Sequence, residues 1–346
     1  MKKFSWAVGI LSFALFAPRA PAWDYEGHRL INQLALASLP TNFPSFVHAA
    51  GAAERVTFLA GEPDRWRNTP DLPLQHCQEP EHFLDLELLA GFDMKAEALP
   101  VFRYDFISAL GAYRSAHPDK AASEDSAPDQ AHKYRWVGLL PWAITENYAK
   151  LKSGFSYLKT FETGGGAPDE IANAQANILY IMGTMGHYAG DASQPLHTTI
   201  HHHGWKGENP HDYSTRPTIH SFIDGYFKQT SAATLKSLSA KLRPAQIVSI
   251  EGRSAKPEEM FQAFMLFIMD AHKLVEPLYK LDKEGKLGPD GDASDGRAFL
   301  EGQLLKSGQL LGDIWFSAWQ QAPPDTFLQR SLAGRKKPAA SDSEKK

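Results

Sequence analysis

Two histidine–aspartate pairs in this sequence have a spacing that suits a metal ion. His187 and Asp191 lie four residues apart in GHYAGDASQPLH, with His197 shortly after them. His220 and Asp224 repeat the spacing in TIHSFIDGYF. Side chains at positions i and i+4 share a helix face, and imidazole nitrogen with carboxylate oxygen suits zinc. Either pair alone fits a hydrogen-bonded core histidine, but the repetition favours a metal site.

Further residues of the same chemical types lie upstream. They are His28, Asp64, Arg67, His82, Phe83 and Asp85. Each has an ordinary explanation when taken alone. Asp64 could cap a helix, Arg67 could form a surface salt bridge, and Phe83 could pack in the core. These alternatives remain open on the sequence alone.

The elements that must position these residues are predicted to be helices, so we expect an all-α fold. Apolar residues recur at helical spacing in six stretches, and alternating strand patterns are scarce. The stretches are 26–39, 101–116, 141–161, 168–191, 258–281 and 296–320. The helix over 168–191 contains Gly183, Gly186 and Gly190. Each glycine costs ~1 kcal/mol relative to alanine, which indicates that something packs closely there.

The first 22 residues have the layout of a secretory signal peptide. Two lysines precede an apolar stretch from Phe4 to Phe16, and a cut is expected after Ala22. The stretch is short for a stable membrane anchor, which is the alternative. We therefore expect a secreted or periplasmic protein whose first residue is Trp23. Its free amino group then becomes available for chemistry.

The remainder is predicted to form one helical domain over 23–329, followed by a disordered tail over 330–346. The polar stretch 117–133 is expected to be a surface excursion. The 346-residue chain has a net charge of -4, which gives no basic surface for gripping duplex nucleic acid. Its single cysteine, Cys77, excludes an internal disulfide. Nothing in the sequence indicates a stable protein partner.

In their order along the chain, these residues resemble the zinc-dependent, single-strand-specific nuclease family (the S-one/P-one type), kin to the zinc-dependent phospholipases C. HYAGDASQPLH looks like the family's His-x-x-x-Asp-x-x-x-x-x-His segment. The resemblance covers most of the chain from Trp23 onward. It implies a mostly helical, secreted protein around a trinuclear zinc cleft. The positions it fills are Trp23, His28, Asp64, His82, His187, Asp191, His197, His220 and Asp224.

The resemblance also implies a role for each residue. Asp64, His82, His187 and one oxygen of Asp191 would hold the first zinc. Trp23, His28 and the other oxygen of Asp191 would hold the second. His197, His220 and Asp224 would hold the third. Arg67 and Asp64 would be catalytic, while Phe83 would stack a base and Asp85 would hydrogen-bond its edge. The implied products carry 5′ phosphates.

The sequence leaves more than one substrate class open. The spacing of His28 from Trp23 and the aspartate at Asp224 favour a nuclease. The loop 198–219 departs from the nuclease pattern, so a zinc-dependent phospholipase C acting on phospholipid is the alternative. A secreted metal-binding module without activity is a further one. We expect His201, His202 and His203 to lie in a solvated loop, although they could also bind phosphate or an extra metal.

Overall fold

Four long helices form the centre of the protein: α1 (Tyr25–Ser38), α7 (Leu140–Gly164), α8 (Pro168–Asp191) and α13 (Ser294–Gln320). The computed structural model describes residues 23–118, 130–131, 137–225, 232–287 and 294–335. Within these ranges the only β-strands are β1 (Ser249–Ile250) and β2 (Arg253–Ser254), which pair antiparallel. The expectation of an all-α protein is therefore confirmed.

Further helices surround these four. The α-helices are α2 (Ala50–Leu59), α3 (Glu62–Arg67), α4 (Leu72–Gln78), α5 (Arg103–Ala116), α9 (Ile219–Asp224), α10 (Ala232–Ser239), α11 (Met260–His272), α12 (Val275–Lys283) and α14 (Thr326–Arg335). The 3-10 helices are η1 (Ser45–His48), η2 (Glu79–His82), η3 (Leu86–Phe92), η4 (Ala96–Ala98), η6 (Pro195–His197), η7 (Ile200–His203) and η9 (Pro257–Glu259).

Local sequence explains where the long helices begin and end. The Asp24 carboxylate caps α1 by accepting from Gly27 N at 3.2 Å. Pro168 occupies the first turn of α8, where a missing N–H is harmless. α7 ends at Gly165, which adopts the left-handed conformation with φ 87° that favours glycine. The predicted boundaries of these helices agree with the structure to within a few residues.

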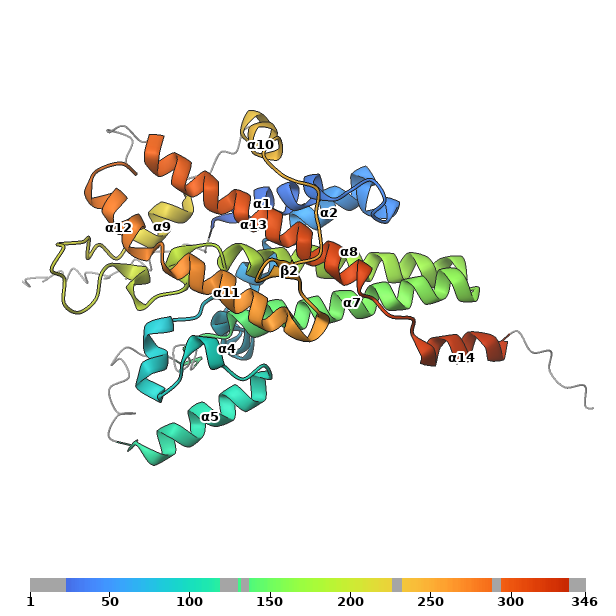
Figure 1. Cartoon of the computed structure of the whole chain (residues 1–346), viewed down its shortest axis with the longest axis horizontal. Coiled ribbons are helices and arrows are strands. Elements are labelled where there is room, and N and C mark those ends of the chain that lie inside the picture. Colours follow the sequence, from blue (N-terminus) through green and yellow to red (C-terminus); the bar gives the residue numbers. More distant parts are fainter. Residues whose placement is uncertain (1–22, 119–129, 132–136, 226–231, 288–293, 336–346) are drawn as a thin grey trace, which may run out of the picture.

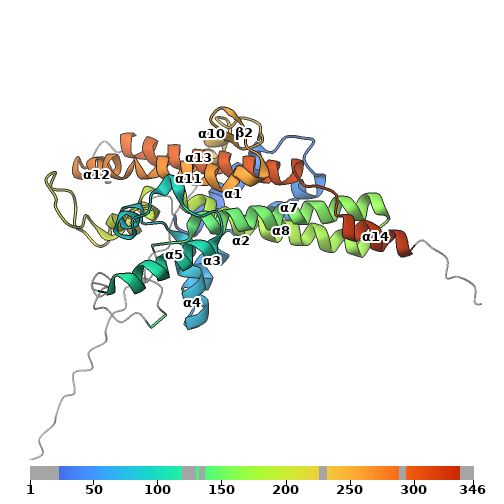
Figure 2. The same ribbon diagram turned by 60° about the horizontal axis from the view of Figure 1, so that its bottom comes forward.

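The long helices pack in two pairs. α7 lies along α8 and α1 lies along α13, while α2 covers α8 from another side (Figure 1). The turned view shows the same arrangement, with α13 running over the α7–α8 pair (Figure 2). The long helices bury large side chains, among them Trp142, Tyr148 and Trp315. Burying such aromatic side chains is a main source of core stability.

The single helix expected over 258–281 is two helices, α11 and α12. They are separated at Lys273 and Leu274. Pro277 supplies the reason, because in a continuous helix its ring would clash with the carbonyl of Lys273, four residues earlier. The buried character expected of the stretch is found in α11, where most residues are buried.

The predicted start of the disordered tail, residue 330, is too early. α14 extends to Arg335, because Leu328 and Leu332 are buried and Arg335 pairs with Glu170 of α8 at 2.9 Å. Residues 336–346, the signal peptide expected over 1–22, and most of the excursion expected over 117–133 lie outside the described residues.

Candidate metal centre

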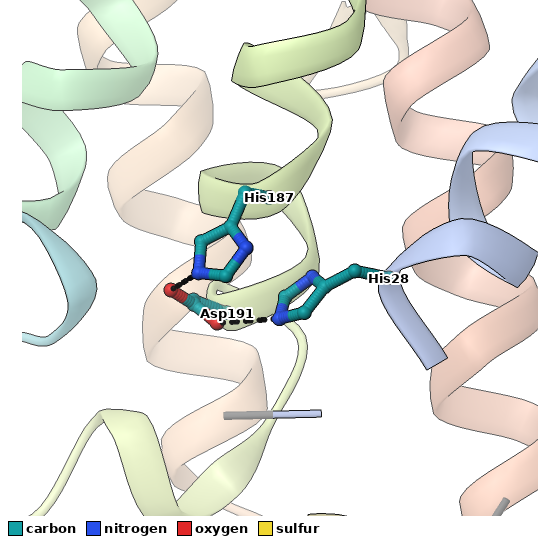
Figure 3. A group of neighbouring side chains, drawn as sticks. All are labelled: His28, His187 and Asp191. Carbon is teal, nitrogen blue, oxygen red and sulfur yellow. Dashed lines mark ion pairs between the residues drawn. The ribbon is translucent and has the colours of Figure 1, made fainter. Parts of the chain in front are cut away.

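The last turn of α8 is the centre of the site. Asp191, the final residue of α8, is fully buried. Its Oδ2 lies 3.1 Å from His82 Nδ1 and 3.5 Å from His187 Nε2. Its Oδ1 faces the other way, 3.5 Å from His28 Nε2 (Figure 3). The two oxygens of one carboxylate thus face two different sets of histidines.

His28 reaches Asp191 because α1 and α8 approach closely. The His28 ring stacks on His187 with 3.7 Å between centroids. A Cβ at Gly190 would lie 2.7 Å from His28 Nδ1, so only glycine leaves room for this ring. The close packing expected at Gly183, Gly186 and Gly190 is confirmed, since an added Cβ at each would clash.

α3 supplies the aspartate predicted upstream. Asp64 Oδ1 lies 3.6 Å from His187 Nε2 and accepts from Arg67 Nε at 2.7 Å. Arg67 is buried, with 11% of its side chain exposed, so the surface salt bridge weighed as an alternative does not apply. Glu79, which sequence reasoning missed, lies 3.7 Å from Arg67 Nη1.

These side chains form a set that we call the inner cluster: His28, Asp64, His82, His187 and Asp191. Two groups of three within it, His28–His187–Asp191 and Asp64–His82–His187, have ligand atoms within 4.8 Å of one another. That is close enough for each group to hold a metal ion. His187 belongs to both groups, so its ligand nitrogen lies near the ligand atoms of each.

His197, His220 and Asp224, which we call the outer cluster, lie beside the inner one. His220 Nε2 lies 3.0 Å from His197 Nε2 and 3.3 Å from Asp224 Oδ2. His197 Nδ1 lies 3.9 Å from Asp191 Oδ1, which joins the two clusters. Gln194, a second residue that sequence reasoning missed, donates to Asp224 Oδ1 at 2.8 Å. Its only sequence signal was its position beside Pro195.

Backbone carbonyls fix the orientation of two of the rings. His187 Nδ1 bonds the carbonyl of Ala60 at 2.8 Å, and His197 Nδ1 bonds that of His82. A carbonyl only accepts, so each Nδ1 carries the proton and each Nε2 presents its lone pair to the site. Metal-binding histidines are held by partners of this kind.

The site buries more carboxylates than its positive charge can balance, which favours a bound cation. Asp64, Asp191 and Asp224 converge near a single arginine, Arg67, and burial raises the pKa of Asp64 to about 6 despite that neighbour. Burial raises the pKa values of Asp191 and Asp224 well above the ordinary range. Burying carboxylates without enough positive charge is unfavourable, and a divalent cation relieves that cost.

The histidines complete this fit. Burial lowers the pKa of His82, His187, His197 and His220 well below the ordinary value, so the rings are neutral, as ligands must be. Within the described residues, Asp191 Oδ1 and Asp224 Oδ2 are buried without a hydrogen-bond partner. Such atoms are usual where a metal binds.

Trp23 lies at the join between the clusters. It is fully buried, and its indole Nε1 donates to Gly190 O at 3.2 Å. The next residue, Asp24, donates its backbone N–H to Asp224 O at 3.2 Å. The first described residue is thereby placed beside the ends of both ligand-bearing helices, α8 and α9.

The predicted base-site residues lie on an extended segment after His82. Gly138 has φ 104°, and a Cβ there would lie 2.0 Å from Phe83 O, so only glycine permits the Leu84–Gly138 bridge. Phe83 is half-buried, whereas Asp85 is buried. Burial raises the pKa of Asp85 to about 7.

The expectation that His201, His202 and His203 lie in a solvated loop is wrong. These residues form η7, in which only His203 is exposed. His201 stacks flat on Trp205, with 4.0 Å between centroids, and His202 lies against Asp85. Packing against Trp205 helps to order the turn, and a run of polar residues gives no sign of that contact.

Comparison of the chain with known protein-family models, curated proteins and solved structures finds no match. None of the described helices is both long enough and apolar enough to span a bilayer. Cys77 is a free, exposed thiol, as a single cysteine requires.

Proposed function

We propose that this protein is a zinc-dependent phosphodiesterase that hydrolyses single-stranded DNA or RNA and leaves 5′ phosphates. The observation that carries the proposal is the arrangement around Asp191. Its two oxygens face different histidines, at 3.1 Å from His82 Nδ1 and 3.5 Å from His28 Nε2. A carboxylate can bridge two cations in this way. The outer cluster beside it offers a third set of ligands.

The residues fit the three-zinc scheme that the family resemblance implies. Asp64, His82, His187 and Asp191 would hold the first ion, and Trp23, His28 and Asp191 the second. His197, His220 and Asp224 would hold the third. When bound, the zinc ions would supply a water of lowered pKa as the nucleophile and polarise the phosphate.

Arg67 is the residue of this chain best placed to stabilise negative charge on the phosphate. Its Nε is committed to Asp64 at 2.7 Å, which fixes the guanidinium beside the inner cluster. Burial lowers the pKa of Arg67, but the neighbouring carboxylates outweigh this and raise it above its ordinary value, so the guanidinium stays cationic at every working pH. A fixed cation in a desolvated site stabilises a developing oxyanion strongly. Asp64 therefore has two roles, as a ligand and as the anchor of Arg67.

Phe83 and Asp85 support a nucleic acid as substrate. A half-buried aromatic ring can stack on a base, and a buried carboxylate nearby can accept from the base's edge. Stacking requires an unpaired base, which favours single strands.

A substrate panel on zinc-loaded protein beginning at Trp23 tests the proposal. We would compare single-stranded DNA, RNA, a 3′-nucleotide and phosphatidylcholine, with and without chelator. Chelator-sensitive release of 5′-nucleotides is expected. Phosphocholine release alone would assign the phospholipase activity instead, and bound zinc without turnover would leave only a metal-binding protein.

Arg67→Ala separates an enzyme from a metal-binding module. We expect turnover to fall about 10²- to 10³-fold, the effect of removing one oxyanion donor, while zinc content persists. Arg65→Ala is the matched control, because Arg65 is on the same helix but two-thirds exposed and, among the described residues, paired only with Glu62. Equal activity of both variants would remove Arg67 from the mechanism.

A further inference from the structure

The turn η7 is held rigidly on three sides. Glu87 accepts from Thr199 Oγ1 and from Ile200 N, the latter at 3.2 Å. The Tyr279 hydroxyl donates to the carbonyl of His201. The His201 ring lies at 5° to Trp205, and its Nδ1 accepts from Lys206 N at 3.0 Å. His202, the next residue, is thereby fixed in place.

His202 is oriented in the same way as the candidate metal ligands. Its Nδ1 bonds the carbonyl of Thr199 at 3.0 Å, so Nδ1 carries the proton and Nε2 is an acceptor. Its side chain is 27% exposed, and its Nδ1 lies 3.9 Å from Asp85 Oδ1. The ring centroids of His202 and His220 are 6.4 Å apart, which places His202 at the edge of the outer cluster.

Asp85 faces this ring with an unused acceptor. Its side chain is nine-tenths buried, and within the described residues its Oδ1 has no hydrogen-bond partner. Phe83 and Asp85 are two residues apart on extended backbone, so their side chains leave the chain on the same side, opposite the buried Leu84. A stacking ring and an unused carboxylate oxygen therefore face the same region as His202.

We propose that His202 is a substrate-binding residue that, together with Asp85, selects guanine. This inference rests on the base site of the proposed function. Both partners accept hydrogen bonds, so the pair matches a base edge with two adjacent N–H donors. Guanine has them in N1–H and its 2-amino group, whereas thymine and uracil offer one N–H between two carbonyls.

Equilibrium binding to the zinc-loaded full chain tests the inference without turnover. The probes are the 5′-monophosphates of guanosine, inosine and uridine; inosine differs from guanosine only in lacking the 2-amino group. We expect guanosine monophosphate to bind about tenfold tighter than the inosine compound, the effect of one hydrogen bond to a buried acceptor. His202→Ala should reduce that ratio to about two or less, with zinc content unchanged.

His211→Ala is the control, because His211 lies on the same loop and is exposed. It should leave the ratio unchanged. His202→Gln, which keeps an acceptor atom, should retain part of the selectivity and guards against an unfolded alanine variant. An unchanged ratio in both His202 variants, no preference in the wild type, or zinc loss in His202→Ala would overturn the inference.

The two proposals fail differently. Guanine-selective binding that depends on His202, without hydrolysis of any nucleic acid, would contradict the nuclease and support the binding site. Hydrolysis without base selectivity would support the nuclease and contradict the guanine-binding site.

Discussion

The inner and outer clusters use the same residue types but are built on different supports. The inner cluster takes its five residues from α1, α3, η2 and α8, and three of its residues lie on long helices. The outer cluster lies on the three-residue turn η6 and the six-residue helix α9. His220 has 12% of its side chain exposed, whereas His28, His82 and His187 are fully buried. Long helices preorganise ligands better than short turns, so the two clusters should differ in affinity.

The largest effect should come from removing the shared carboxylate. Asp191→Asn removes a negative charge from both halves of the inner cluster, so we expect turnover to fall at least about 10³-fold. Zinc content should fall by two ions per chain, as measured by atomic absorption. Asp224→Asn, the matched change in the outer cluster, should release a single ion. Equal zinc loss in the two variants would show that Asp191 is not shared.

Stepwise chelation should separate the clusters next. At low chelator the outer ion should leave first with little change in Tm. At higher concentration the inner ions should leave and lower the free energy of unfolding by about 3 kcal/mol, the stabilisation that a ligand far above its Kd provides. Calorimetry across a chelator series measures both steps. Simultaneous release with one drop in Tm would contradict a difference in affinity.

The packing around the inner cluster can be disturbed without substituting any candidate metal-ligand residue. In Gly190→Ala the added Cβ meets His28 at 2.7 Å, so we expect a loss of about 2 kcal/mol in unfolding free energy and weaker zinc binding.

The control is Gly302→Ala in α13, where a Cβ meets nothing within 4 Å. That change should stabilise the helix by about 1 kcal/mol. Urea unfolding of both variants gives the comparison, and similar stabilities would show that α1 and α8 adjust freely.

The smallest effect concerns Asp85, beside the outer cluster. Burial raises the pKa of Asp85 to about 7, above its ordinary 3.8. The folded state therefore binds the proton more tightly, so this group's contribution to stability is lost as pH rises from about 4 to about 7. Asp85→Asn removes that dependence.

Relative to the wild type, Asp85→Asn should gain about 1 to 2 kcal/mol in unfolding free energy between pH 5 and pH 8. Denaturation at the two pH values measures the gain. A stability difference that is the same at both would place the Asp85 carboxylate in a more polar environment than its burial indicates.

Sequence periodicity was sufficient for the main helices. α8 spans the predicted 168–191, and the glycines on it do meet close neighbours. Periodicity failed where a long-range contact or a single proline decides the outcome. Pro277 divides a stretch that periodicity alone predicts to be one helix. α14 persists because Leu328 and Leu332 are buried, and Arg335 reaches Glu170, 165 residues away in sequence.

The candidate ligands could be found from residue type and order, but their supports could not. Gln194, Glu79 and the carbonyl of Ala60 orient Asp224, Arg67 and His187, and no spacing rule connects these partners. The support of His202 was similarly hidden, because contacts that order η7 come from Glu87 and Tyr279, far away in the sequence. Such partners depend on tertiary packing that local patterns do not encode.

The bond from Trp23 to Gly190 spans 167 residues, and that from His187 to His82 spans 105. Contacts so distant along the chain form late, because closing long loops is entropically unfavourable. A complete inner cluster thus requires that α1, η2 and α8 have already assembled. Metal capture should therefore be the last step of folding, and its rate should report when the native topology is reached.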